Sequence, residues 1–373
     1  MSGALVAMSG GVDSSVAALL TVERGLDCAG SMMKLFDNED IGLSRDEGRG
    51  EGRGKTCCSV KDAADAADVA RRLGIPFYVF NFADTFRKEV IDRFIEAYQN
   101  GRTPNPCIDC NRYLKFERLL RRAKSLEKEY VVTGHYARIE IRAGNSRRLL
   151  KKGVDLSKDQ SYVLYMMTQE QLGSVLFPLG ELNKSQVREI ALEHGFVNAE
   201  KRDSQDICFV RGEDYADFIT DYIRQYTGTE TPKGRFVDTD GNDLGEHKGI
   251  IHYTVGQRRG LGLSAAMPLY VREVRPEDNS VVVGTADSLY AKTLIAGDIN
   301  LIAVERFDTA MKVHARIRYN QREQPATVWQ LDSDTLRIEF DSPQRAITSG
   351  QAAVLYDGET VIGGGTINEV LWN

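Results

Sequence analysis

The feature that most constrains the fold of this chain is a short apolar run that ends in two glycines and leads directly into a helical pattern. Residues 4–8 are apolar, Ser9, Gly10 and Gly11 follow, and residues 14–24 repeat apolar side chains at helical spacing. This order predicts a strand, a tight turn and a helix. Such a turn directs several backbone N–H groups and the positive end of the helix at one point, which suits a phosphate group.

The same alternation continues through the first half of the chain. Strands are expected near residues 28–36, 77–82 and 130–133, and helices are expected near residues 59–73, 84–99 and 114–126. Strands separated by helices of this length form a parallel sheet that is covered on both faces. In residues 48–54 every second residue is glycine, which predicts a mobile loop inserted between elements.

The pattern changes in the second half of the chain. A helix is expected over residues 214–226, and short alternating segments such as 312–319 and 335–340 dominate after about residue 281. Short strands at this spacing predict an antiparallel barrel or sandwich. We therefore expect an α/β domain over residues 1–213, a small mixed connector domain over 214–281 and a β domain, an antiparallel β-barrel, over 282–373.

Composition excludes several classes of protein. Hydrophobic residues make up 42% and charged residues 27% of the 373 residues, as in ordinary globular proteins. No apolar run approaches the ~20 residues of a membrane helix, and the run at residues 4–8 is too short for a signal peptide. We therefore expect a cytoplasmic protein with no membrane partner. Six cysteines are too few for a disulfide scaffold in a chain of this length.

The net charge of −6 argues against a protein that binds nucleic acid through its overall field. Local basic clusters nevertheless occur in several parts of the chain. Such runs are usually solvated surfaces, but they also suit the phosphates of an RNA. The clusters are Arg118, Arg121, Arg122 and Lys124; Arg147, Arg148, Lys151 and Lys152; Arg258 and Arg259; and Arg316, Arg318 and Arg322.

Three cysteines are candidates for chemistry. Cys107 and Cys110 lie in a proline-stiffened loop before a predicted helix, and Cys208 lies in a later loop. A cysteine at a helix N-terminus has a lowered pKa, so Cys110 is a candidate thiolate nucleophile. A zinc site would need a second Cys-x-x-Cys, and a thioredoxin-like pair would directly follow the first strand. The third hypothesis makes Cys110 and Cys208 a sulfur-handling pair that exchanges a persulfide and a disulfide.

Seven segments, taken together, resemble one known family. The first, SGGVDSS, resembles the pyrophosphate loop of the N-type ATP pyrophosphatases, which adenylate a carbonyl oxygen and release pyrophosphate. The ordered set is similar to the bacterial tRNA-specific 2-thiouridylases over nearly the whole chain, and it implies a PP-loop N-terminal domain of the HUP type. The segments are SGGVDSS, GRTPNPCIDCN, VTGHYAR, LSKDQSYVLY, DSQDICF, HYTVGQRRGLG and SGQAAVLYDG with GGGTI.

The resemblance implies a sulfurtransferase that acts on tRNA. ATP with Mg would adenylate C2 of wobble uridine 34, and sulfur from a cysteine persulfide would then give 2-thiouridine. The base must leave the anticodon stack, which costs about a few kcal/mol. The implied substrates are tRNAs for Lys, Glu and Gln, and the implied sulfur donor is a cysteine desulfurase or a sulfur-relay protein.

The resemblance also implies three sets of site residues. The catalytic set is Cys110 and Cys208, which would form a disulfide as sulfur is released, together with Asp13 at the Mg–phosphate site. The ATP-binding set is Ala7, Met8, Ser9, Gly10, Gly11, Val12, Asp13, Ser14, Met33 and Gly134. The tRNA-binding set is Asn105, Pro106, Cys107, His135, Lys158, Asp159, Gln160, Arg318, Tyr319 and Gln351.

One residue departs from the family pattern. Many members carry Asp at the position of Cys107. If Cys107, Cys110 and Cys208 converge, their thiolates could instead hold a [4Fe–4S] cluster whose fourth iron binds sulfide. We favour the persulfide route, because a disulfide needs only two of the three thiols.

The sequence is also compatible with two other classes of protein. A PP-loop synthetase for small molecules, similar to argininosuccinate synthase, would share the glycine turn but need neither a cysteine pair nor a basic β domain. An RNA-binding module without catalysis would show no turnover of ATP to AMP that depends on tRNA.

Overall fold

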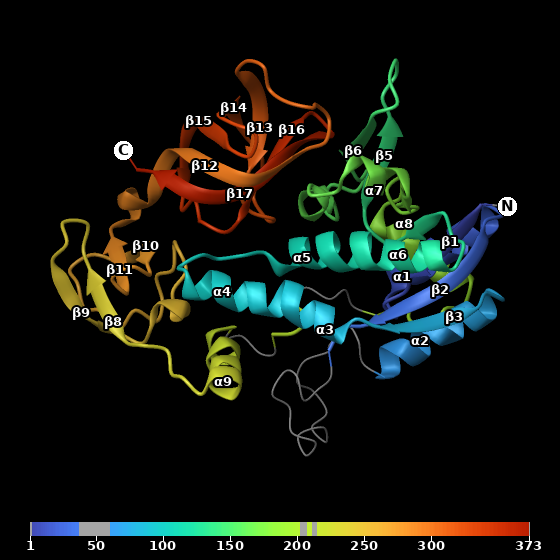
Figure 1. Ribbon diagram of the computed structural model, residues 1–373, viewed down its shortest axis with the longest axis horizontal. Coiled ribbons are helices and arrows are strands. Elements are labelled where there is room, and N and C mark those ends of the chain that lie inside the picture. Colours follow the sequence, from blue (N-terminus) through green and yellow to red (C-terminus); the bar gives the residue numbers. More distant parts are fainter. Residues whose placement is uncertain (1, 37–59, 202–206, 211–214, 373) are drawn as a thin grey trace. The chain divides into compact units, whose positions relative to one another are not determined.

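The computed structural model describes residues 2–36, 60–201, 207–210 and 215–372 (Figure 1). The predicted loop at 48–54 and the pair Cys57 and Cys58 lie outside these residues. The chain divides into two compact units: a first unit of residues 1–90, 106–212 and 359–361, and a second unit of residues 91–105, 213–358 and 362–373. Among the described helices, none has the length and apolar character needed to cross a membrane.

A five-stranded sheet forms the centre of the first unit. Its strands lie in the order β3-β2-β1-β4-β7, and every neighbouring pair is parallel. This arrangement confirms the predicted α/β domain with a parallel sheet. The strands are β1 Gly3–Ala7, β2 Asp27–Lys34, β3 Phe77–Asn81, β4 Tyr130–Val132 and β7 Val175–Leu176.

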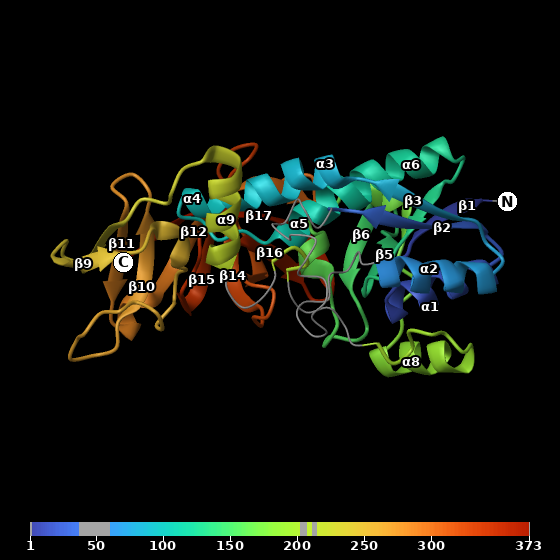
Figure 2. The same cartoon turned by 90° about the horizontal axis from the view of Figure 1, so that it is seen from below.

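Helices lie on both faces of this sheet (Figure 2). On one face, α1 Val12–Glu23, α2 Val60–Arg72 and α8 Lys184–Glu193 share a core with the buried side chains of β1 and β4. Helix α6 Leu119–Ser125 lies on the other face. The first unit also holds α3 Ala83–Phe86, α5 Pro106–Asp109, α7 Gln169–Gly173 and the hairpin of β5 Ala137–Ile141 and β6 Arg148–Lys152.

Two predicted helices contain wide π-helical turns. Residues Arg87–Asp92 form one between α3 and α4 Arg93–Gln99, and residues Cys110–Arg118 form the other between α5 and α6. The second helix therefore begins at Pro106, well before the expected residue 114. Proline suits a first helical position, because the N–H that it lacks would have no intrahelical partner there. As a result, Cys107 occupies the first turn and Cys110 lies further along the helix. Such wide turns are frequent at functional sites.

The second unit contains the predicted β-barrel. Its strands are connected in the order β12-β15-β14-β13-β16-β17, and β17 pairs back with β12 in antiparallel fashion. This pairing closes the sheet and thus gives a barrel, the first of the two forms that the strand pattern allowed. The strands are β12 Tyr290–Leu301, β13 Met311–Arg316, β14 Gln324–Gln330, β15 Leu336–Arg345, β16 Ala352–Asp357 and β17 Thr360–Leu371.

A smaller mixed sheet precedes the barrel along the chain, as expected for the connector. Its strands lie in the order β10-β11-β8-β9; β8 and β11 are parallel, and the other pairs are antiparallel. Phe236, Val271 and Val281 are buried in its core. Its strands are β8 Gly234–Val237, β9 Asp243–His247, β10 Tyr270–Arg275 and β11 Ser280–Gly284, and helix α9 Tyr215–Thr227 precedes them.

Residues 91–105 fold with the second unit, although they lie within segment 1–213. The Tyr222 hydroxyl donates to Asp92 at 2.6 Å, and the rings of Tyr98 and Tyr215 are 4.5 Å apart. Further along, the Thr103 N–H donates to the Ser349 carbonyl at 2.8 Å. The turn that precedes β16 therefore holds the segment that leads into the helix of Cys107 and Cys110.

Candidate active site around the glycine turn

The glycine turn connects β1 to α1 as predicted, and its own hydroxyls fix its shape. The Ser9 N–H donates to the Ser14 hydroxyl at 3.1 Å, and that hydroxyl donates to the Gly11 carbonyl at 3.0 Å. Gly10 has φ +73°, and a Cβ atom there would lie 2.4 Å from the carbonyl oxygen of Asp62, so this position requires glycine. The first amide groups of α1 have no intrahelical partners and are directed at the turn, which suits a pyrophosphate.

Two residues that precede Cys208 in the sequence, Asn198 and Lys201, hydrogen-bond to the Gly10 carbonyl in this turn. Asn198 Nδ2 donates to this oxygen at 3.1 Å, and Lys201 Nζ donates to it at 2.9 Å. Lys201 also forms an ion pair with Asp65 at 3.0 Å. The Asn198 Oδ1 atom is buried and has no hydrogen-bond partner in the part of the chain that the structure describes. Neither Asn198 nor Lys201 was predicted from the sequence.

Asp13 lies in the first turn of α1 and has two partners that the sequence did not indicate. Lys184 Nζ contacts its two carboxylate oxygens at 2.7 and 2.8 Å, and the Tyr136 hydroxyl donates to it at 2.8 Å. The Asp13 side chain remains 30% exposed. A carboxylate that is accessible beside a phosphate-binding turn can serve as a ligand for Mg.

Gly134 lies against the first turn of α1. A Cβ atom at this position would lie 2.9 Å from both the carbonyl carbon of Asp13 and the amide nitrogen of Ser14. Because those atoms belong to the backbone, only glycine allows this close approach. The segment that contains Gly134 therefore sits beside the glycine turn.

His135 is buried in the first unit. Its Nδ1 atom lies 2.7 Å from the Thr133 hydroxyl, and its ring lies 5.9 Å from the Phe116 ring and 5.8 Å from the Phe177 ring. Burial lowers the pKa of His135 well below its usual value. His135 is thus a neutral imidazole at pH 7, suited to hydrogen bonding and packing and unsuited to carrying a charge.

Residues 158–160 contact Tyr136 through hydrogen bonds of Gln160. Gln160 accepts a hydrogen bond from the Tyr136 N–H at 3.1 Å and donates its own N–H to the Tyr136 carbonyl at 3.0 Å. The buried Asp159 accepts from the Ser161 N–H and hydroxyl at 3.1 and 2.9 Å. Lys158 is half-buried. Residues 158–160 therefore form an ordered turn that is bonded to Tyr136, the residue whose hydroxyl contacts Asp13.

The cysteine helix is bonded to the same region. Asn111, which follows Cys110, is buried and donates from Nδ2 to the Val163 carbonyl at 2.9 Å. Val163 lies in the helical turn Ser161–Leu164. A continuous path of bonds thus runs from the Cys110 helix through residues 159–163 and Tyr136 to Asp13 in the glycine turn. The Asn111 Oδ1 atom is buried without a hydrogen-bond partner among the described residues.

The three candidate cysteines differ in exposure. Cys107 is exposed, and Cys110 and Cys208 are half-buried. Cys208 lies in residues 207–210, where Phe209 is fully buried and its ring packs edge-on against Phe86 at 5.7 Å. Within the described ranges, which include these cysteines, no three His, Cys, Asp or Glu side chains are grouped to hold a metal ion. This arrangement therefore gives no support to an iron–sulfur site.

Three more of the predicted ATP residues lie at the carboxyl ends of neighbouring parallel strands, and a fourth, Val12, begins α1. Ala7 ends β1, Met8 follows it and donates its N–H to the Ser31 carbonyl at 2.7 Å, and Met33 lies near the end of β2. In open α/β sheets, ligands bind at this edge. The position of these residues is consistent with a nucleotide site.

Four predicted tRNA residues belong to the second unit: Asn105, Arg318, Tyr319 and Gln351. The Arg318 guanidinium donates to the Thr348 hydroxyl at 2.9 Å and to the Ala346 carbonyl. Gln351 Nε2 donates to the Thr103 carbonyl at 2.8 Å. Both side chains thus hold the turn at residues 346–351, and Gln351 also holds the segment that precedes Pro106.

We expect Lys184→Met to lower the rate of ATP-dependent pyrophosphate release about tenfold, equivalent to about 1.4 kcal/mol in the barrier. The substitution removes the cation that orients the Asp13 carboxylate while keeping the length of the side chain. The rate is measured with a coupled pyrophosphate assay. Lys233→Met, which removes a surface ion pair with Glu246, is the control. An unchanged rate for Lys184→Met would show that this ion pair serves only the fold.

Comparison with known proteins adds to this geometry. The model described as tRNA methyl transferase HUP domain matches residues 3–212, and the models described as tRNA methyl transferase PRC-barrel domain and Aminomethyltransferase beta-barrel domain match residues 220–285 and 291–367. The chain is 46% identical over 367 residues to the tRNA-specific 2-thiouridylase MnmA of Clostridioides difficile (strain 630), covering 98% of both chains. It is 49% identical over 363 residues to the tRNA-specific 2-thiouridylase MnmA 1 of Thermoanaerobacter sp. (strain X514), covering 97% of both chains.

Proposed function

The chain belongs to the family of tRNA-specific 2-thiouridylases, and we propose that it replaces the C2 oxygen of wobble uridine 34 in tRNA by sulfur in a reaction that consumes ATP. The observation that carries this proposal is the bonded path from the glycine turn, through Tyr136 and Gln160, to the helix of Cys110. Adenylation modifies the oxygen bonded to C2, and sulfur then attacks C2 itself, so both steps must take place at the same position of the base. A fold that joins a phosphate-binding turn to a reactive cysteine supports both steps.

ATP binds with its phosphates at the glycine turn, and Asp13 is the residue that would hold the accompanying Mg. The amide groups of α1 and the Lys184 ammonium are suited to the charge of the phosphates. Uracil C2=O is a poor leaving group, so its oxygen first attacks the α-phosphorus of ATP. The bond to pyrophosphate breaks, and AMP becomes attached to the base oxygen.

Sulfur then replaces this oxygen. The terminal sulfur of a persulfide on Cys208 attacks C2, and AMP leaves with the oxygen. The Cys110 thiolate attacks the Cys208 sulfur, so the bond between Cys208 and the transferred sulfur breaks and a Cys110–Cys208 disulfide forms. The transferred sulfur is reduced, the two cysteines are oxidised, and a thiol reductant restores them for the next cycle.

The partners follow from this chemistry. We assign to the extruded base residues 105–107, His135 and residues 158–160. We assign to the rest of the tRNA the side chains of Arg318, Tyr319 and Gln351. We infer substrates among the tRNAs for Lys, Glu and Gln, a cysteine desulfurase or relay protein as sulfur donor, and action in the cytoplasm. We also infer a division of the chain into domains at residues 1–213, 214–281 and 282–373.

The proposed function is tested with purified protein, unmodified tRNA, ATP and a persulfide donor. Mass spectrometry of the digested tRNA should show 2-thiouridine at position 34, and AMP and pyrophosphate should form in equal amounts. A tRNA with cytidine at position 34 is the matched control. AMP formation that needs a small acceptor and no tRNA would instead indicate a PP-loop synthetase.

Cys107→Asp separates the two sulfur routes. We expect this variant to keep its activity with a persulfide donor, because Cys110 and Cys208 remain to exchange sulfur. If Cys107 were an iron ligand, a hard oxygen would replace a soft thiolate, and activity with free sulfide would fall. The variant is assayed anaerobically with each donor, beside the unaltered protein. Loss of activity with both donors would contradict the persulfide route.

A further inference from the structure

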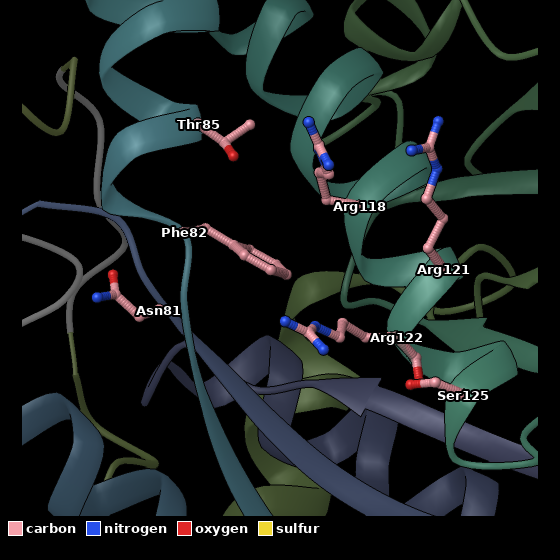
Figure 3. A pocket seen from close by; sticks show the side chains of 7 residues that line it. All are labelled: Asn81, Phe82, Thr85, Arg118, Arg121, Arg122 and Ser125. Atoms are coloured by element: carbon pink, nitrogen blue, oxygen red, sulfur yellow. The ribbon is translucent and has the colours of Figure 1, made fainter.

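A basic pocket lies in the first unit, lined by residues that the reaction described above does not use (Figure 3). It has a volume of about 280 Å³ and lies where the end of β3 and the start of α3 meet the helix that ends with α6. Its residues come from two segments that are remote in sequence. They are Asn81, Phe82, Thr85, Arg118, Arg121, Arg122 and Ser125.

The arginines reach this pocket because of helical spacing. Arg118, Arg122 and Ser125 are four and then three positions apart, so they lie on one helix face. In Figure 3 the Arg122 guanidinium points from the helix toward Phe82, and that of Arg121 points away. Arg121 also has its own counter-charge, since it pairs with Glu117 at 2.7 Å.

The other two arginines lack such a counter-charge. No carboxylate of the described residues pairs with Arg118 or Arg122. The Arg122 guanidinium lies over the Phe80 ring, 5.7 Å from its centre, a contact that leaves the positive charge in place. Two like charges that share a concave site repel each other, and an anion bound between them would relieve this repulsion.

The aromatic side of the pocket is rigid. Phe82, which lines the pocket, directly follows the edge strand β3 and continues the alternation of Tyr78 and Phe80 in that strand. The three rings are stacked at centre distances of 6.2 and 6.1 Å. Phe82 is 6% exposed, so it forms a fixed wall. The side chains of Thr85 and Ser125 bring hydroxyl groups to the same pocket.

We propose that this pocket binds a phosphate of the tRNA backbone, held mainly by Arg118 and Arg122; this inference rests on the proposed function. A phosphodiester shares one negative charge between two non-bridging oxygens that point apart, so each guanidinium can bind one of them. A single carboxylate of an acidic protein fits one guanidinium fork and leaves the other without a partner. Because tRNA is the substrate in the proposed function, we assign this pocket to RNA and not to an acidic protein surface.

The test is the double variant Arg118→Gln with Arg122→Gln. Glutamine is a good helix former and the replaced side chains are on the surface, so the helix should persist. The dissociation constant for tRNA is measured over a range of salt concentrations. We expect binding about tenfold weaker at low salt and a salt dependence that is flatter by about one unit of slope, as for the loss of one phosphate contact.

The matched control is Arg24→Gln with Arg71→Gln, which removes the same charge from exposed positions of the first unit. It should keep the slope of the unaltered protein. A double pocket variant that shares this slope would overturn the proposal. The proposal would also be wrong if the pocket variant kept the salt slope of the unaltered protein but formed 2-thiouridine more slowly with a protein persulfide donor. In that case the pocket would bind an acidic protein.

A titration with inorganic phosphate tests whether the pocket binds free phosphate and not a phosphate of the tRNA backbone. In titrations monitored by NMR, it should bind the pocket only weakly, and tRNA should displace it. Tight phosphate binding that tRNA does not displace would overturn the assignment to the tRNA backbone. Failure of the proposed function would be seen in a different measurement. The unaltered protein would then form no 2-thiouridine, whatever salt dependence the variants show in tRNA binding.

Discussion

The Cys208→Ser protein is expected to form no detectable 2-thiouridine and to bind tRNA with an affinity within a few-fold of the unaltered protein. The Cys110→Ser protein should show the same loss. In the proposed reaction both thiols act in bond making and breaking, and neither holds the RNA phosphates. Mass spectrometry of the tRNA product and a filter-binding assay measure the two quantities.

The two variants should differ in the step at which they stop. After exposure to a persulfide donor, Cys110→Ser should carry one extra sulfur atom on Cys208, because nothing releases it. Cys208→Ser should carry no such sulfur on Cys110 and still release pyrophosphate. Intact-protein mass spectrometry distinguishes these states. An extra sulfur on Cys110 of the Cys208→Ser protein would reverse the two roles.

Cys28→Ala provides the matched control. Cys28 is buried in β2, and burial raises the pKa of its thiol, so the group stays protonated and unreactive near neutral pH. This variant should keep forming 2-thiouridine. Formation of 2-thiouridine by either Cys110→Ser or Cys208→Ser at the rate of the control would remove that residue from the mechanism.

The first unit shows which parts of such a fold can be predicted from sequence. The strands and helices around the glycine turn follow from local apolar periodicity, and the structure confirms a parallel sheet there. The start of the cysteine helix could not be predicted in the same way. Pro104 and Pro106 predict a loop. In the structure, however, Pro106 begins the helix, and wide π-helical turns continue it.

The partners of the site residues are harder to predict than the residues themselves. Lys184 contacts Asp13 from 171 positions away in the sequence, and Asn198 reaches Gly10 across 188 positions. Such contacts depend on how α8 and the following segment pack, and no local pattern encodes that packing. Tyr136 and Asn111 did fall within recognised motifs, but their hydrogen-bond partners become visible only in three dimensions.

Gly11→Val should give a folded protein that binds tRNA but releases no pyrophosphate from ATP. Gly11 caps α1 with φ −93° and ψ 159°, an extended conformation that β-branched residues also adopt. Among the described residues, a Cβ atom there would meet only the Ser9 hydroxyl, at 3.4 Å. The fold itself therefore does not require glycine at this position, and we expect the substitution to cost only about 1 kcal/mol of stability through a poorer helix cap.

The loss of activity has a different cause. A phosphate bound at a glycine turn must come within hydrogen-bond distance of backbone N–H groups, and a branched side chain at residue 11 occupies that approach. Gly11→Ala carries a smaller group and should fall between the two proteins in activity. The assay combines thermal unfolding, tRNA affinity and tRNA-dependent pyrophosphate release. Gly134→Val differs in kind, because its side chain would collide with the Asp13 and Ser14 backbone and lower stability together with activity. Normal pyrophosphate release by a folded Gly11→Val protein would place the ATP phosphates elsewhere.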